Sequence, residues 1–264
     1  MIGGLLAASS RPGFSIPDVH ELFEYKHCFV GSGFLCVNRV ALLIFLATIV
    51  IFLLFFFAFR APKLVPTGSQ NVLEAFIQFV HDQLVIDVIG HAGVAYTPYL
   101  ATLFIFVFVT SVIEVIPGLQ FPATSRMAIP AFLALLTWVI FNTAGIRAKG
   151  WGGYLKGVLF PPGVPVALYI IVAPIELVST LIFRPFTLAL RLFANLFAGH
   201  LLLTIFYLGT AYLLQPSITA LFAGASLLMA IFLTGLEIFV AILQAYVFTI
   251  LTAVYIAGAV SAEH

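Results

Sequence analysis

The stretch RPFTLALRLFANLFAGHLL, residues 184–202, is strongly apolar, yet it carries two arginines, an asparagine and a histidine. Arg191 and Asn195 are four residues apart, so on a helix they lie one turn apart on the same face. An arginine at the centre of a membrane-spanning helix costs about 2.5–3.5 kcal/mol on insertion scales. Because ionisable groups inside a membrane usually mark ion paths, this stretch predicts charge chemistry within the bilayer.

A second group of polar residues lies near the carboxyl end of the chain. Glu237 and Gln244 are seven residues apart and share one helical face. Their polar character complements that of Arg191 and Asn195, so we expect the two segments to meet at a hydrated cleft. His200 follows Arg191 by nine residues and is expected on roughly the opposite side of its helix.

Several of these residues also have purely structural interpretations. Glu114, near the end of an apolar run, could reach the lipid headgroups. Arg184 precedes Pro185, and it could be the partner of Glu176 at a kink.

The residues of the expected cleft have such interpretations as well. Asn195 or Gln244 alone could form an interhelical hydrogen bond that contributes about 1 kcal/mol. Arg191 and Glu237 could form a buried ion pair that only holds the fold together.

The composition places these residues in lipid. The chain has 264 residues, of which 63% are hydrophobic and 8% charged, whereas soluble domains are about 45–50% apolar and about 25% charged. The net charge is +1, and no basic run supports nucleic-acid binding. The sequence contains no catalytic triad, phosphate loop or metal-spaced cluster, so we expect neither a metal nor a cofactor. Cys28 and Cys36 could be bridged or free.

Five apolar segments are long enough to cross a bilayer as helices, over about residues 40–59, 98–116, 127–145, 164–214 and 217–258. Residues 68–90 mix apolar and polar groups with a helical period, which predicts an amphipathic helix on the membrane surface. The last two segments exceed 40 residues each, so they are strongly tilted or extend beyond the bilayer. The expected fold class is an all-α integral membrane protein.

The polar, charged and helix-breaking residues between the apolar segments predict how the chain is organised. Residues 1–38 form an external amino-terminal segment, and residues 39–264 form a single polytopic membrane domain. A basic loop with Arg147, Lys149 and Lys156 is expected after the third span. Pro185 is expected to bend the fourth segment, and residues 215–216 to end it.

The polar pattern resembles subunit a of F-type ATP synthases, and the loop pattern is most similar to bacterial, actinobacterial members. The family signature R-L-x-x-N-x-x-A-G is matched by Arg191, Leu192, Asn195, Ala198 and Gly199. The spacing from Glu237 to Gln244 and the following QAYVF stretch also match. One departure is the spacing from Glu176 to Arg191, which is one residue longer than in several relatives and leaves their relative orientation open.

The resemblance implies two offset aqueous half-channels, built from helices within about residues 164–262. They carry protons to and from carboxylates of a ring of c subunits, which couples a proton gradient to rotation and ATP synthesis. Arg191 is then the essential arginine that faces these carboxylates. The outer half-channel would be lined by Glu114, Asn195, His200, Glu237 and Gln244. The cytoplasmic half-channel would be lined by Glu176, Ser179 and Thr187.

The resemblance also implies partners and a location. The partners would be the c-ring, b-type peripheral stalk subunits, the rest of the ATP synthase and the lipid bilayer, with no nucleic acid. The chain itself would not act on ATP. It would lie in a bacterial plasma membrane, with the amino terminus outside and the carboxyl terminus in the cytoplasm; a mitochondrial inner membrane is the alternative. Protons are favoured over sodium because no oxygen-rich sodium site is visible.

Two other classes of function remain as alternatives. In a secondary transporter, Arg191 and Glu237 would bind an anionic solute, although such transporters are built from repeats that this sequence does not display. A purely structural membrane anchor would tolerate any substitution of Arg191.

Overall fold

The computed structural model describes residues 39–60, 63–116, 127–160, 168–214 and 219–260. All of its regular elements are helices. The α-helices are α3 (Arg39–Phe59), α4 (Ser69–Phe79), α5 (Thr97–Val115), α6 (Ala128–Leu159), α7 (Tyr169–Val178), α8 (Arg184–Leu213) and α9 (Thr219–Val260). Two π-helices, η3 (Val80–Ile86) and η6 (Ser179–Phe183), and a 3₁₀-helix, η4 (His91–Tyr96), complete the set. The expected amino-terminal segment, both cysteines and residues 215–216 lie outside the described residues.

The five expected membrane spans are confirmed by length and composition. Five helical stretches are long and apolar enough to cross a membrane, namely Val40–Phe59, His91–Ile113, Ala128–Leu159, Tyr169–Leu213 and Leu221–Val260. The first is strongly exposed along its length, with Phe45 at 68% and Phe52 at 65%. The exposed Thr48 hydroxyl donates to the Ile44 carbonyl of the same helix, so this face suits contact with lipid. The chain is therefore an all-α membrane protein.

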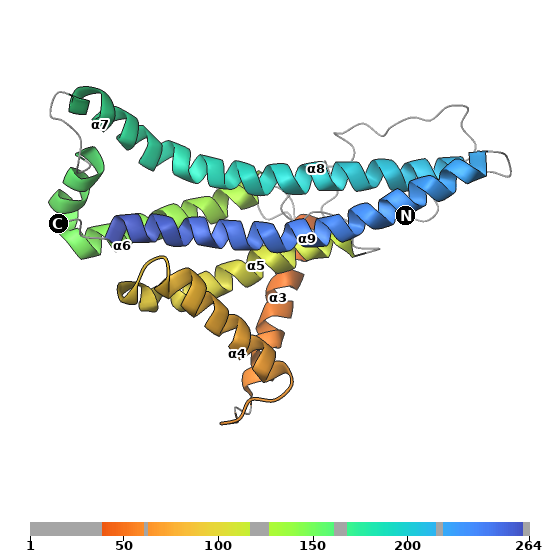
Figure 1. Cartoon of the computed structure of the whole chain (residues 1–264), viewed down its shortest axis with the longest axis horizontal. Helices are drawn as coiled ribbons and strands as arrows, with labels where there is room; N and C mark the ends of the chain where they lie inside the picture. Colours follow the sequence, from red (N-terminus) through yellow and green to blue (C-terminus); the bar gives the residue numbers. More distant parts are fainter. Residues whose placement is uncertain (1–38, 61–62, 117–126, 161–167, 215–218, 261–264) are drawn as a thin grey trace, which may run out of the picture.

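Helices α8 and α9 run alongside each other through the molecule, with α6 packed against both and α5 against α9 (Figure 1). Helix α9 contacts each of the other three. Its buried face carries small residues at four-residue intervals, at Ala241, Ala245, Thr249 and Ala253. Small residues let neighbouring helices approach closely in a membrane, so this row explains how one helix can contact three.

Helix α3 runs steeply across the direction of α8 and α9 (Figure 1). The three helices therefore cannot all stand upright in one bilayer. Since α9 alone has 42 residues, about 63 Å at 1.5 Å per residue, it exceeds a hydrocarbon core of about 30 Å. Tilting of the long pair fits both observations.

The segment predicted as an amphipathic helix is helical, as α4 followed by η3. Part of its apolar surface is buried, with Leu73 at 6% and both Val80 and Leu84 at 0% exposure, whereas Val72 and Phe79 are exposed. Asp82 and Asp87 are exposed. Helix α4 contacts α3, whereas η3 contacts α5 and α9. Its position on the membrane surface stays a prediction.

The expected basic loop after the third span is wrong. Arg147 and Lys149 belong to α6, and the chain is again helical at Lys156. Between them Gly150 has φ 72° and ψ 165°, so it breaks the helix and redirects it. This conformation is readily available to glycine, which has no Cβ. A cluster of basic residues and glycines looks like a loop in the sequence, but here one glycine alone supplies the turn.

The redirected end of α6 folds back on the membrane helix. The Tyr154 hydroxyl donates a hydrogen bond of 2.8 Å to Asn142 Oδ1. A Cβ at Gly145 would lie 2.5 Å from the Tyr154 ring, so this glycine makes room for the tyrosine. Tyr154 thus fastens the short second part of α6 to the first.

Candidate functional site

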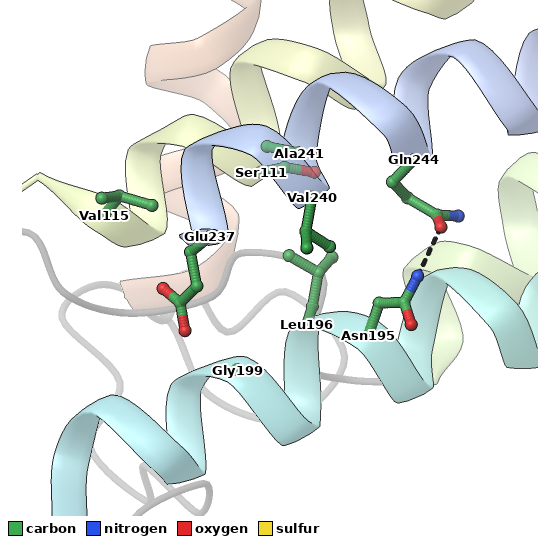
Figure 2. Close-up of a pocket in the computed structure, with 9 residues that line it drawn as sticks. All are labelled: Ser111, Val115, Asn195, Leu196, Gly199, Glu237, Val240, Ala241 and Gln244. Atoms are coloured by element: carbon green, nitrogen blue, oxygen red, sulfur yellow. Dashed lines mark hydrogen bonds between the residues drawn. The ribbon is translucent and has the colours of Figure 1, made fainter. Parts of the chain in front are cut away.

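A pocket opens between α5, α8 and α9 and encloses about 300 Å³, part of it open to the surface. Figure 2 shows the side chains that line it: Ser111, Val115, Asn195, Leu196, Gly199, Glu237, Val240, Ala241 and Gln244. Three of the residues predicted from the sequence, Asn195, Glu237 and Gln244, therefore meet at one place. The expected cleft between the two long helices is present.

Asn195 and Gln244 connect the two helices directly. Asn195 Nδ2 donates a hydrogen bond of 2.6 Å to Gln244 Oε1 (Figure 2). Gln244 is only 3% exposed, and its Nε2 has no hydrogen-bond partner within the part of the chain that the structure describes. A buried N–H group needs an acceptor, so this amide offers a donor to water or to another group that enters the pocket.

Glu237 lies against the backbone of α8 because the facing residue is a glycine. A Cβ on Gly199 would come within 2.7 Å of Glu237 Oε1. In Figure 2 the carboxylate extends from α9 towards α8, beside Gly199. The glycine of the signature motif thus leaves space for the acidic side chain of the pocket.

Helix α5 supplies a residue that the sequence reasoning missed. Ser111 is 2% exposed, and its hydroxyl donates a hydrogen bond of 2.8 Å to the Val107 carbonyl. The sequence signal was a hydroxyl three residues before Glu114 in an apolar run. Glu114 itself lies on α5, but its side chain is outside the described part of the structure.

Arg191 lies beside this pocket without lining it. Its side chain is exposed, whereas Leu188, Leu192 and Leu196 on the same helix are buried. These leucines are spaced by four residues and form the packed face of α8. Arg191 therefore points away from that face. Because Arg191 is exposed, it is not one half of a buried structural pair with Glu237.

His200 is 8% exposed, on the side of α8 away from the exposed Arg191, as its nine-residue spacing predicts. It is not among the residues that line the pocket. The structure therefore brings Asn195, Glu237 and Gln244 together but leaves His200 next to this group, beyond Gly199.

A second polar cluster lies where α7 meets α8. Arg184 Nη2 donates to Glu176 Oε1 at 2.7 Å, with the two side chains 30% and 33% exposed. The Thr180 hydroxyl lies 3.4 Å from the same oxygen. This confirms the kink pair that the sequence offered as one interpretation of Arg184.

The other two residues expected in the cytoplasmic half-channel flank this cluster in the sequence. Ser179 is half-buried at the start of η6. Thr187 is exposed, and its hydroxyl donates a hydrogen bond of 2.7 Å to the carbonyl of Phe183, the last residue of η6. Neither side chain is hydrogen-bonded to Glu176 in the described structure.

Arg191 thus lies between two polar groups along α8. It is seven residues after Arg184 and four before Asn195. A carboxylate can accept and return a proton, whereas an arginine keeps its proton at any physiological pH. The arrangement can therefore pass protons on either side of a permanent positive charge.

Among the described residues, no group of three or more His, Cys, Asp and Glu side chains could hold a metal ion.

Comparison with known proteins gives one family. The sequence matches the family described as ATP synthase A chain over residues 41–257. Subunit a of the ATP synthase of Frankia alni is 49% identical, over 96% of this chain and 88% of the relative. The corresponding subunit of Nocardioides sp. is 42% identical over 95% of this chain and 92% of its own length. That of Maricaulis maris is 34% identical over 94% and 96%.

Proposed function

The chain belongs to the ATP synthase A chain family, and we propose that within the ATP synthase it forms two offset half-channels that carry protons to and from a c-ring. The family assigns it to ATP synthesis and proton transport. Its bacterial relatives and its five membrane-capable helices make it a multi-pass bacterial membrane protein. The half-channels, and the residues that line them, are what we add.

The outer half-channel includes the pocket between α5, α8 and α9. In this proposal Glu237, Asn195 and Gln244 carry or orient protons and water, and Glu114 and His200 extend the path. The observation that supports it most directly is that a carboxylate and an amide of α9 and an amide of α8 converge on one pocket. Such groups are costly in lipid and usually mark a path for ions.

The gate of this proposal is Arg191. A c-ring carboxylate that has taken up a proton is neutral, so it can turn through lipid without the cost of a bare charge. When it reaches Arg191, the nearby cation favours the ionised form and promotes proton release. Arginine suits this role because it cannot itself pass the proton between the two half-channels. The exposure of its side chain, away from the leucine face of α8, supports an approach from outside this chain.

The cytoplasmic half-channel would contain Glu176, Ser179 and Thr187. The partial exposure of Glu176 supports contact with water. Each charge that crosses 100 mV releases about 2.3 kcal/mol, so several protons must be added together to drive the synthesis of one ATP. The bacterial plasma membrane and the b-type stalk subunits complete the proposed setting.

The replacement of Arg191 by alanine tests the proposal. Arg191→Ala should abolish ATP-driven proton pumping, because no fixed charge then separates incoming from outgoing protons. Pumping can be measured in inverted membrane vesicles with a pH-sensitive dye. Assembly is checked by the amount of the subunit in the purified complex.

Arg147→Ala is the matched control, since Arg147 is an exposed arginine on α6, three residues before Gly150. It should pump at the normal rate. Normal pumping by Arg191→Ala would refute the proposed gate.

A further inference from the structure

Glu176 and Arg184 are eight residues apart along one continuous helical stretch. On a straight α-helix eight residues rise about 12 Å, and the two positions differ by about 80° around the axis. Yet Arg184 Nη2 and Glu176 Oε1 are 2.7 Å apart. The helix between them is therefore changed in a way that lets the two side chains meet.

The change is the π-helix η6. The backbone N–H of Arg184 donates to the carbonyl of Ser179, five residues earlier. A π-helical turn closes with i→i+5 bonds, so it holds one residue more than an α-helical turn. Pro185 follows immediately, and it has no N–H to continue the regular ladder. The turn thus holds one residue more between Glu176 and Arg184 than a regular α-helical turn would.

Arg184 also holds this bend against the rest of the bundle. Its guanidinium carbon lies 5.6 Å from the centre of the Tyr255 ring on α9. The Tyr255 ring in turn lies 5.8 Å from that of Phe141 on α6. One arginine therefore joins α7, through Glu176, to α9 and α6.

We propose that the Glu176–Arg184 pair, stacked on Tyr255, is a brace that sets the rotation of α8 and so positions Arg191. The proposal rests on the gating role of Arg191 proposed above. Helix α8 is uninterrupted from Arg184 to Leu213. Arg191 comes two turns after Arg184, only about 20° away around the axis. A rotation of the helix at Arg184 is therefore carried to Arg191 almost unchanged.

A cross-link between α8 and α9 reports this rotation without reference to transport. Asn195 lies one turn beyond Arg191 and contacts Gln244. In a chain whose Cys28 and Cys36 are replaced by alanine, Asn195→Cys and Gln244→Cys are joined by a short bis-methanethiosulfonate reagent. The rate of cross-linking is measured in the assembled ATP synthase in native membranes.

The brace predicts a particular pattern of rates. Arg184→Gln and Glu176→Gln should each slow cross-linking by about fivefold, and the double variant should also be about fivefold slower. Independent effects would multiply instead, to about 25-fold. Arg184→Lys should restore most of the rate because the ion pair can re-form. Arg147→Gln, which removes an exposed arginine elsewhere, should have no effect.

Unchanged cross-linking in Arg184→Gln, or a double variant whose effect is the product of the single ones, would overturn the brace. The result is separable from the proposed function. If the brace variants slow cross-linking while Arg191→Ala still pumps, the brace stands and the gate fails. If cross-linking is unaffected while Arg191→Ala does not pump, the gate stands and the brace fails.

Discussion

At the scale of single residues, the Glu237 carboxylate on α9 faces Gly199 on α8 across the pocket. Glu237 can lie against α8 because Gly199 has no side chain, with 2.7 Å between the carboxylate oxygen and the place a Cβ would occupy. The signature motif of the family includes this glycine, and the structure gives it a physical reason. A glycine inside a helix is destabilising by about 1 kcal/mol relative to alanine, so the close approach has to compensate for it.

Gly199→Ala should therefore displace the Glu237 carboxylate and slow proton flux by about fivefold, since overpacking typically costs about 1–3 kcal/mol. ATP-driven pumping in inverted vesicles measures the effect. Gly224→Ala is the matched control, because a Cβ there meets nothing within 4 Å. Equal pumping by the two variants would remove the role given to Gly199.

The sequence predicts those residues of the site whose place follows from helical periodicity. Spacing alone placed Asn195 on one helical face and His200 on the other, and the pairing of Glu237 with Gln244 followed from seven-residue periodicity. Ser111 was missed because a single serine in an apolar helix is usually satisfied by its own backbone, as it is here. Its place in the pocket depends on how α5 packs against α9, which periodicity does not contain.

At the scale of helices, the sequence predicts the membrane spans but not the irregular turns within them. The sequence predicts the five spans because each is a long apolar run, which composition alone identifies. It does not predict the π-helical turn before Pro185, because this proline indicates a bend but not the form of the bend. An i→i+5 turn requires neighbours such as Tyr255 to hold it, and these are distant in the sequence. The helix break at Gly150 looks like a loop in the sequence for the same reason, since the contacts of Tyr154 with Gly145 and Asn142 return the chain to the helix.

The row of small residues on α9 gives a prediction about helix packing. Ala245 is 0% exposed, so Ala245→Leu adds three carbon atoms where there is no space. Overpacking should lower the stability of the subunit by about 1–3 kcal/mol. The midpoint of thermal unfolding in detergent, or the yield of folded subunit, measures this.

Ala225→Leu is the same change at an exposed position of the same helix and should leave the midpoint in place. If Ala245→Leu is as stable as Ala225→Leu, the small residues are not required for packing.

The directions of the helices matter at the scale of the whole molecule. Helix α3 and the α8–α9 pair cross steeply (Figure 1), although all three are long and apolar enough to span the bilayer. We therefore expect the axis of α3 to lie closer to the membrane normal than the axes of α8 and α9. Oriented solid-state NMR of the protein, labelled separately in each helix, measures these tilts. Equal tilts would contradict the arrangement.

Helix α9 has one further property, which is mechanical. It runs for 42 residues without a proline, and it carries both Glu237 of the pocket and Tyr255 of the Arg184 contact. The two residues are 18 positions apart (255 − 237), about 27 Å along an α-helix. The interval between the two polar sites is therefore set by a stiff rod of peptide units. A displacement of the helix at one of these sites is therefore transmitted to the other site, because no proline hinge lies between them to absorb it.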